Sequence, residues 1–302
     1  MNHAAADARG ASMRTSKSQL TIRVSGTGFH SDTYKGSQIN TAPDISFGWV
    51  AGEAVEVDSV TTRPFVFFDL GGTLVDLRGI VTSMASRLQA IHVRGPIPLA
   101  LLWATKTAAR LPAATGPKFR SEREIATNVL AELLRDRNRE KALEEATRLV
   151  REAWDGYVQR CALHPDVSVA WLRALRSKVA GLGIVTDGDT EAVAGVLAHT
   201  NLKGAFDSIT ISEEVRTYKP DPRMYRTAME SLGSKPAESL FVSDAALDLQ
   251  GAIQVGMHAA WIQRTSLGEL AKPPAGSLVL ARLEDLERIV KRYARSGRFE
   301  LR

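Results

Sequence analysis

The chain has 302 residues, 44% of them hydrophobic and 24% charged, which is enough apolar sequence to bury the core of one or two domains. This composition excludes a collagen, a coiled coil and a wholly disordered chain. The formal net charge is +5, and its densest basic stretch, residues 288–302, is typical of the solvated face of a last helix. No RNA-binding, zinc-finger or helix-turn-helix pattern accompanies this charge, so we expect no nucleic acid as a partner.

Two observations bear on location. The longest apolar stretch, residues 97–104, is far shorter than the ~20 residues of a membrane-spanning helix, and residues 1–30 lack the apolar run of a signal peptide. Cys161 is the only cysteine, which excludes an intrachain disulfide and favours a reducing compartment. We therefore expect a cytoplasmic protein without a membrane partner.

Residues 1–62 differ from the rest of the chain. They are rich in Ser, Thr, Gly and Ala, and only residues 19–24 alternate briefly like a strand. We predict a disordered or poorly structured tail. Because the first thirty residues contain a single acid, Asp7, a targeting segment is the alternative interpretation.

From residue 63 onward the pattern predicts an α/β domain. The apolar run at residues 65–68 is brief and rich in β-formers, as expected of a buried strand. Further strands are predicted at residues 183–185, 208–211, 239–242 and 259–262, and the helices predicted between them span residues 191–199, 223–232 and a segment ending at 255. Such alternation predicts a Rossmann-like parallel sheet with helices on both faces.

The segment between the first two strands predicts a separate unit. Residues 121–134 and 139–158 carry apolar side chains at helical spacing, and glycines and prolines divide the segment into several helices. It leaves the sheet at the carboxyl end of a strand, where ligands bind in open α/β sheets. We therefore predict a core of residues 63–79 and 166–302 covered by a helical cap of residues 80–165.

Reactive side chains follow four of the predicted strands. Asp69 follows the first, Thr186 ends the second, Lys219 follows the third, and Asp244 and Asp248 follow the fourth. The loops after parallel strands meet at one edge of a sheet, so we expect these side chains to converge. A carboxylate beside an ammonium, a hydroxyl and two further carboxylates suits phosphoryl transfer, with a divalent cation shielding the charge.

Four segments in order resemble the motifs of the haloacid dehalogenase (HAD) superfamily of hydrolases. They are FVFFDLGGTLVD at residues 65–76, GLGIVTDGD at 181–189, TYKPDPRMY at 217–225 and LFVSDAALDLQGAIQVGM at 240–257. The resemblance covers residues 64 to about 295 and implies an aspartate nucleophile. The inserted helices resemble the α-helical cap of the family's first subclass.

The resemblance also implies a role for each matched residue. The expected roles are catalytic for Asp69, Thr186 and Lys219, metal-binding for Asp69, Asp244 and the carbonyl of Gly71, and supporting for Thr73, Asp248 and Ser243. Oxygen ligands of this kind suit Mg²⁺. The expected function is Mg²⁺-dependent hydrolysis of a small phosphorylated metabolite through an aspartyl-phosphate, and the oligomeric state is left open.

One position departs from the family's phosphatases. They carry a second acid two residues after the nucleophile, whereas this chain has Gly71 there. The general acid–base catalysis lost with that acid is typically worth about 10²–10⁴-fold. Two alternatives therefore stay open. One is a 2-haloacid dehalogenase-type hydrolase, whose halide leaves without a proton, and the other is a catalytically weak HAD-fold protein used for binding or regulation.

The third and fourth motifs and the segment after them bear on the dehalogenase alternative. Tyr225, Ser243 and AAWIQRT at residues 259–265 resemble dehalogenase segments. Asp244 and Ala245, however, stand where a neutral residue and an asparagine are expected. The fourth motif therefore combines dehalogenase and phosphatase features.

The cap leaves one expected residue unassigned. Ala104 lies near the place of a halide-binding arginine in the dehalogenases, and Lys106 or Arg110 is a candidate substitute. The phosphonatases, a further branch with a small residue at the position of Gly71, need a cap lysine, for which Lys106 and Lys118 are candidates.

Overall fold

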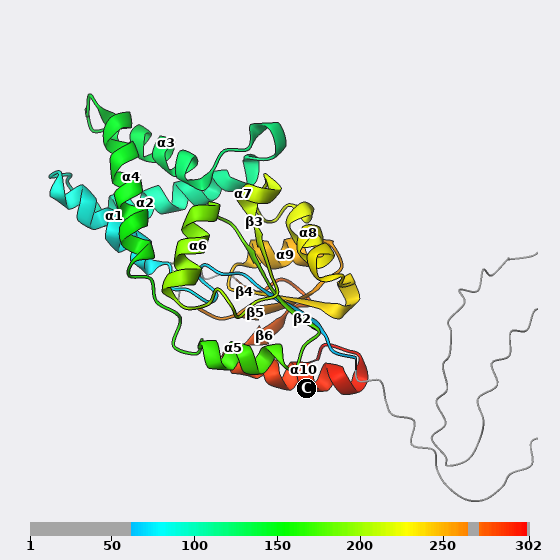
Figure 1. Cartoon of the computed structure of the whole chain (residues 1–302). Coiled ribbons are helices and arrows are strands. Elements are labelled where there is room, and N and C mark those ends of the chain that lie inside the picture. The colour runs from blue at the N-terminus through cyan, green and yellow to red at the C-terminus, as the bar shows by residue number, and fades with distance from the viewer. Residues whose placement is uncertain (1–61, 265–271, 301–302) are drawn as a thin grey trace, which may run out of the picture. The chain divides into compact units, whose positions relative to one another are not determined.

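The computed structural model describes residues 62–264 and 272–300, and within these ranges six strands form one sheet in the order β3-β2-β1-β4-β5-β6 (Figure 1). The strands are β1 (Phe65–Phe68), β2 (Gly181–Thr186), β3 (Ser208–Ile211), β4 (Ser239–Ser243), β5 (His258–Ile262) and β6 (Leu278–Leu280). Every neighbouring pair is parallel. This is the predicted α/β architecture, with β6 as a strand that the sequence pattern did not predict.

The central strand β1 sets the edge at which the reactive residues emerge. Phe68 lies opposite Ile184 of β2 and Val242 of β4. The backbone amide of Asp69 then donates a hydrogen bond to the carbonyl of Val242 at 2.9 Å. The register therefore brings the chain after β1 beside the chain after β4.

Helices cover both faces of the sheet (Figure 1). They are α5 (Val169–Arg176), α6 (Thr190–His199) and α10 (Leu286–Ser296) on one face, α8 (Pro222–Leu232) and α9 (Ala246–Gln254) on the other, and the short α7 (Ser212–Val215) directly after β3. Val66 and Phe68 point into the first of these layers and Phe67 into the second, and all three side chains are fully buried. A strand buried on both faces explains why β1 is a continuous apolar run.

Four helices between β1 and β2 share a separate hydrophobic cluster. They are α1 (Arg78–Ala90), α2 (Pro96–Arg110), α3 (Glu122–Arg135) and α4 (Ala142–Val158). Pro96 begins α2, where its missing N–H costs no hydrogen bond, and Ser121 caps α3 by accepting from the amide of Glu124 at 3.2 Å. Both helices predicted in this segment are present, each shifted by at most a few residues. The domain boundaries at residues 80 and 165 stay a prediction.

Two predictions fall partly outside what the structure covers. The tail of residues 1–62 and the brief strand at 19–24 lie outside the described residues, apart from Thr62. In the described ranges, no helix is long and apolar enough to cross a membrane.

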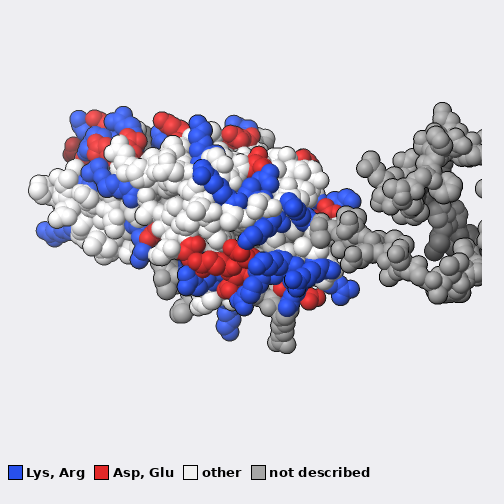
Figure 2. Space-filling model, turned by 60° about the horizontal axis from the view of Figure 1, so that its bottom comes forward, with Lys and Arg blue, Asp and Glu red and all other residues white. Residues whose placement is uncertain are grey.

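Charged side chains of both signs lie together on the face drawn in Figure 2. In the basic stretch at the end of the chain, Arg288 pairs with Asp285 at 2.5 Å. On the preceding segment, Arg282 pairs with Glu284 at 2.7 Å, and Lys178 of the core pairs with Glu287 at 2.7 Å. Exposed pairs of this kind add little stability, but they offset the basic charge locally.

The cap cluster yields a test on two leucines of neighbouring helices. Leu130 of α3 is fully buried, whereas Leu143 of α4 is 51% exposed. We expect Leu130→Ala to lower the free energy of unfolding by about 2–5 kcal/mol, because it leaves a cavity. Leu143→Ala should change it by less than about 1 kcal/mol. Urea unfolding measures both, and equal losses would contradict the proposed cap core.

Candidate active site

Lys219 is the centre of the site. Its ammonium lies 2.5 Å from Oδ1 of Asp69 and 2.5 Å from Oδ2 of Asp248, and all three residues are buried. The face of Phe241 lies 5.9 Å from the same nitrogen. The chain therefore brings one cation and two carboxylates, from the segments that follow three different strands, into direct contact, as the spacing predicted.

A threonine joins Asp69 to a third carboxylate. The hydroxyl of Thr73 lies 3.1 Å from Oδ2 of Asp69 and 3.2 Å from Oδ1 of Asp244, and it accepts a hydrogen bond from the amide of Asp244 at 3.0 Å. The indole of Trp261 holds the carbonyl of Asp244 at 3.0 Å. Thr73 thus braces the loops after β1 and β4 against each other.

Residues of the third and fourth motifs hold Asp248 from two sides. The hydroxyl of Ser243 donates to Oδ2 of Asp248 at 3.4 Å and accepts from the amide of Ala245 at 3.1 Å. The hydroxyl of Tyr225, in α8, donates to the carbonyl of Asp248 at 2.7 Å. These contacts fix the Asp248 carboxylate against Lys219.

Thr186 lies at the same edge but is not joined to this cluster. Its buried hydroxyl donates to the carbonyl of Asp187 at 3.0 Å. Within the described residues, no hydrogen bond links that hydroxyl to Asp69 or Lys219. The link runs through the next residue instead, because the carboxylate of Asp187 accepts from the amide of Lys219 at 3.0 Å. The catalytic role of Thr186 stays a prediction.

Gly71 and Gly72 meet different neighbours. Gly72 has φ of 86°, and a Cβ there would lie 2.8 Å from both carboxylate oxygens of Asp244. The φ of Gly71 is outside the left-handed region, and a Cβ there would lie 3.1 Å from the nearer Cδ atom of Leu77. An apolar side chain therefore lies where the phosphatases would carry their second acid.

Burial changes the ionisation of the central groups. It raises the pKa of Asp69 to about 7, against the opposing charge of Lys219. It likewise raises the pKa of Asp187 to about 7, again opposed by Lys219. Burial alone would lower the pKa of Lys219, but the charges of Asp248 and Asp69 hold it well above its ordinary value. Lys219 is therefore a permanent cation at every physiological pH.

The predicted magnesium ligands fit a hard cation in chemical type. Asp69 and Asp244 both contact Thr73, so their carboxylates lie on the same side of the loop that carries Gly71. Carboxylate and carbonyl oxygens suit Mg²⁺. Across residues 62–264 and 272–300, no group of three or more His, Cys, Asp or Glu side chains forms a metal site. The metal assignment stays a prediction.

The sequence interpretation missed Arg264 and Glu122. The guanidinium of Arg264 donates to the carbonyl of Thr73 at 2.9 Å and to Asp166 at 2.7 Å, so it ties the loop that follows Asp69 to Asp166. Glu122, the first residue of α3, approaches the loop after Thr186. Arg264 lies in the segment AAWIQRT, but that resemblance gave it no role, and an acid in a first helical turn normally signals only helix capping.

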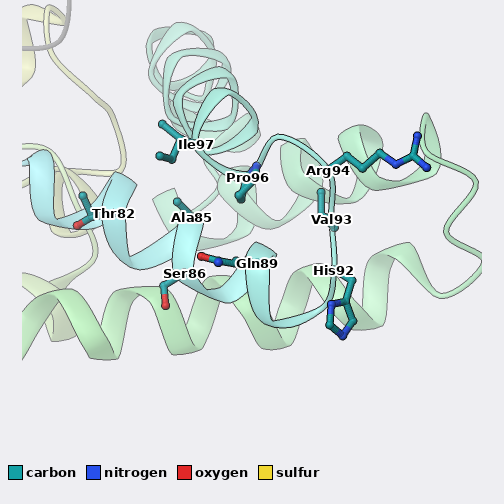
Figure 3. A pocket seen from close by; sticks show the side chains of 9 residues that line it. All are labelled: Thr82, Ala85, Ser86, Gln89, His92, Val93, Arg94, Pro96 and Ile97. Atoms are coloured by element: carbon teal, nitrogen blue, oxygen red, sulfur yellow. The ribbon is translucent and has the colours of Figure 1, made fainter.

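The candidate cap cations do not converge on Asp69. Arg110 donates two hydrogen bonds to Glu132 of α3, at 2.9 and 2.7 Å, and Lys106 and Lys118 are exposed. A separate pocket of about 700 Å³ lies between the end of α1 and the start of α2 (Figure 3). Its lining, which includes Gln89 and Ile97, contains none of the predicted site residues, so we do not assign the reaction to it.

The comparisons identify the family. A sequence model of the haloacid dehalogenase-like hydrolases matches residues 65–256, which is more than half of the chain. The chain belongs to this family of hydrolases, and the predicted resemblance is confirmed.

Relatives within the family carry two activities in their names. The chain is 36% identical over 122 residues to (S)-2-haloacid dehalogenase 1 of a Pseudomonas species, covering 40% of this chain and 53% of the relative. It is 33% identical over 137 residues to phosphoserine phosphatase of Thermus thermophilus, covering 43% of this chain and 55% of the relative. The chain thus spans about half the length of these curated relatives.

A solved structure supports the fold. The L-2-haloacid dehalogenase of Xanthobacter autotrophicus, with chloropropionic acid covalently bound, matches with a TM-score of 0.61 and 22% identity. The match covers 76% of this chain and 99% of that one. The Rossmann-like core with an inserted helical cap is therefore confirmed.

The raised pKa of Asp69 predicts a pH profile. A carboxylate attacks only when it is deprotonated, so the ionisation of Asp69 should make kcat/KM rise with pH up to about 7. Below about pH 6 it should fall about tenfold per pH unit. A profile measured on the best substrate tests this, and a rate that does not change between about pH 5.5 and about pH 8 would contradict it.

Proposed function

We propose that this hydrolase cleaves the carbon–halogen bond of a small 2-haloacid, with Asp69 as the nucleophile. The observation that carries the proposal is at Gly71, two residues after Asp69, where the acid of the phosphatases is missing and the side chain of Leu77 lies 3.1 Å from the place of a Cβ. A halide leaves as an anion and needs no proton from such an acid. The proposal reverses the order of the two functions expected from sequence.

In the first step, the Asp69 carboxylate attacks the carbon that bears the halogen. A carbon–oxygen bond forms, the carbon–halogen bond breaks, and the halide departs with its electron pair, leaving an ester on Asp69. Lys219 orients the carboxylate through Oδ1 at 2.5 Å, and Thr73 contacts the other oxygen at 3.1 Å. The two contacts hold the nucleophile in one orientation.

In the second step, water attacks the acyl carbon of the ester. Asp248 is the proposed general base, because its carboxylate is held at Lys219 and at Ser243, next to the ester. The water proton passes to Asp248, the acyl–oxygen bond breaks, and Asp248 returns this proton to the departing alkoxide oxygen, so that the product leaves as the 2-hydroxy acid. Asp69 is restored with one oxygen derived from water.

The relatives support this chemistry. Several of the matched curated proteins are named as 2-haloacid or haloacetate dehalogenases, and one haloacetate dehalogenase, from a Moraxella species, aligns over 69% of this chain. The three contacts of the proposed mechanism come from residues within the matched family segment, 65–256. Family membership favours an enzyme over the binding protein that the sequence left open.

Asp244 favours a second candidate, a magnesium-dependent phosphatase. Its carboxylate shares the Thr73 hydroxyl with Asp69, and one matched relative is named phosphoserine phosphatase. Asp69, Asp244 and the carbonyl of Gly71 would hold Mg²⁺, which would shield the charge of a phosphoryl group. The missing acid at Gly71 counts against this candidate.

An assay with and without chelator separates the candidates. We expect halide release from 2-chloropropanoate to survive EDTA, because the proposed steps use only Asp69, Lys219 and Asp248. Asp69→Asn should abolish it, and Asp244→Asn should keep it within about tenfold of the wild type, since Asp244 takes no part in the two proposed steps. Phosphate release that depends on Mg²⁺ and is lost in Asp244→Asn would instead establish the second candidate.

An oxygen label tests the bond that water breaks. During turnover in ¹⁸O-water, the proposed dehalogenase places the label in the Asp69 carboxylate, because water attacks the acyl carbon. In a phosphatase, water attacks phosphorus and Asp69 keeps its own oxygens. Mass spectrometry of the peptide that contains Asp69 measures the label, and the Asp69→Asn protein serves as control. An unlabelled peptide after many turnovers would contradict the ester mechanism.

A further inference from the structure

Helix α3 of the cap is bound to the loop after β2. The carboxylate of Asp189 accepts from the amide of Glu122 at 2.7 Å and from the amide of Arg123 at 3.0 Å. Asp189 directly precedes α6, yet its side chain caps α3 instead. The first amide of α6 has a different acceptor, because the amide of Thr190 donates to the carboxylate of Glu213 at 2.7 Å. Two hydrogen bonds thus fix the first two residues of α3 against the core.

This attachment brings the Glu122 side chain to the site. Its Oε2 lies 3.6 Å from the place of a Cβ at Gly188, two residues after Thr186. Asp187, directly before Gly188, accepts from the amide of Lys219 at 3.0 Å, so the loop that Glu122 approaches is the one bonded to the Lys219 segment. Glu122 belongs to the cap and to none of the four sequence motifs, yet its side chain lies beside the loop after β2, which is the motif-two loop.

The carboxyl of Glu122 has neighbours but no partner. No hydrogen bond or ion pair from any other described residue reaches it, although it is only partly exposed. The acids beside it are engaged: Asp187 accepts from Lys219, and Asp189 accepts from α3. The cation next to it in the chain, Arg123, faces Asp189 and Glu191. A carboxyl held this way has a hydrogen-bonding group to offer to a ligand.

The surroundings of Glu122 favour its neutral form. The charged and titratable groups that face it are Asp187 and Asp189 after β2, Lys219 and Tyr218 before α8, and Tyr157 of α4. Burial, followed by the charges of Asp189 and Asp187, raises the pKa of Glu122 to about 8, and Lys219 opposes the change. At neutral pH the carboxyl therefore carries a proton and acts as a donor.

We propose that Glu122, which the attachment of α3 holds at the loop after β2, is a specificity-determining residue whose carboxyl donates a hydrogen bond to the carboxylate of the substrate. The inference rests on the proposed function, whose substrate is a carboxylate anion. Lys219 is bound by Asp69 and Asp248, so the anion needs a further donor near the motif-two loop. Once Glu122 loses its proton, it repels the anion instead, and binding weakens.

The test compares the pH dependence of KM in matched variants. In the wild type, KM for 2-chloropropanoate should rise about tenfold between about pH 7 and about pH 9, with kcat nearly constant. Glu122→Gln keeps a donor at every pH, so its KM should change by less than about twofold over the same range. Asp69 and Asp187 titrate in both proteins, so the difference between the profiles isolates Glu122.

Glu124→Gln is the matched control. Glu124 is exposed on the same helix, two residues on, and pairs with Arg120 at 3.0 Å. This variant should keep the wild-type pH profile, and melting temperatures of all variants check the fold. A pH-dependent KM in Glu122→Gln equal to that of the wild type would overturn the proposal, as would an effect of Glu122→Gln on kcat alone.

A binding measurement separates this inference from the proposed function. The Asp69→Asn protein is titrated calorimetrically with 2-chloropropanoate at about pH 7 and about pH 9, with and without Glu122→Gln. Binding that weakens at high pH only when Glu122 is present supports the inference even if the wild type releases no halide, in which case the proposed function alone fails. If the wild type releases halide but binding has the same pH dependence with and without Glu122→Gln, the inference alone is rejected. If 2-chloropropanoate does not bind at all, both the inference and the proposed function are rejected.

Discussion

The contact on which the site depends is the buried ammonium of Lys219 between the carboxylates of Asp69 and Asp248, at 2.5 Å from each. Burying a charge costs several kcal/mol per ion, by order of magnitude, unless an opposite charge accompanies it. The charge of Lys219 lowers the pKa of Asp69 against the effect of burial, and the charges of Asp248 and Asp69 keep the pKa of the buried lysine high. The three segments that supply these groups are therefore tied together electrostatically as well as through the sheet.

The convergence of these groups was predictable because it follows from strand direction. The strands that precede Asp69 and Asp244 are short apolar runs, and parallel strands deliver the residues that follow them to one edge. The strand β6 was not predictable in this way, since Leu278–Leu280 has three residues at the sheet edge and no periodicity to reveal it. Helices α3 and α4 were predictable because their apolar stripes repeat over several turns.

Contacts between cap and core were beyond the sequence. Asp189 has the position of an N-cap for α6, and local rules assign it there, but its side chain caps α3. Glu122 reads as an ordinary first-turn acid for the same reason. Both assignments depend on which helix packs against which loop, and that information is absent from local spacing. The pair of glycines was equally ambiguous, because only the structure shows that Gly72, not Gly71, has the left-handed backbone and the close approach to Asp244.

The missing acid at position 71 is thus a chemical feature and not a backbone requirement, since Gly71 lies outside the left-handed φ region and the atoms nearest to a Cβ there belong to the flexible side chain of Leu77. The balance of charge points in the same direction. Asp69, Asp187, Asp244, Asp248 and Glu122 lie around a single lysine, which is a surplus of acid. A phosphate dianion meets this surplus with twice the charge of a haloacid, so it requires a bound cation at Asp69 and Asp244. A haloacid monoanion needs less compensation of this negative charge, because protons retained on carboxyls such as Glu122 remove much of the repulsion. The choice between the two chemistries therefore rests on whether this site offsets its negative charge with a metal ion or with protons.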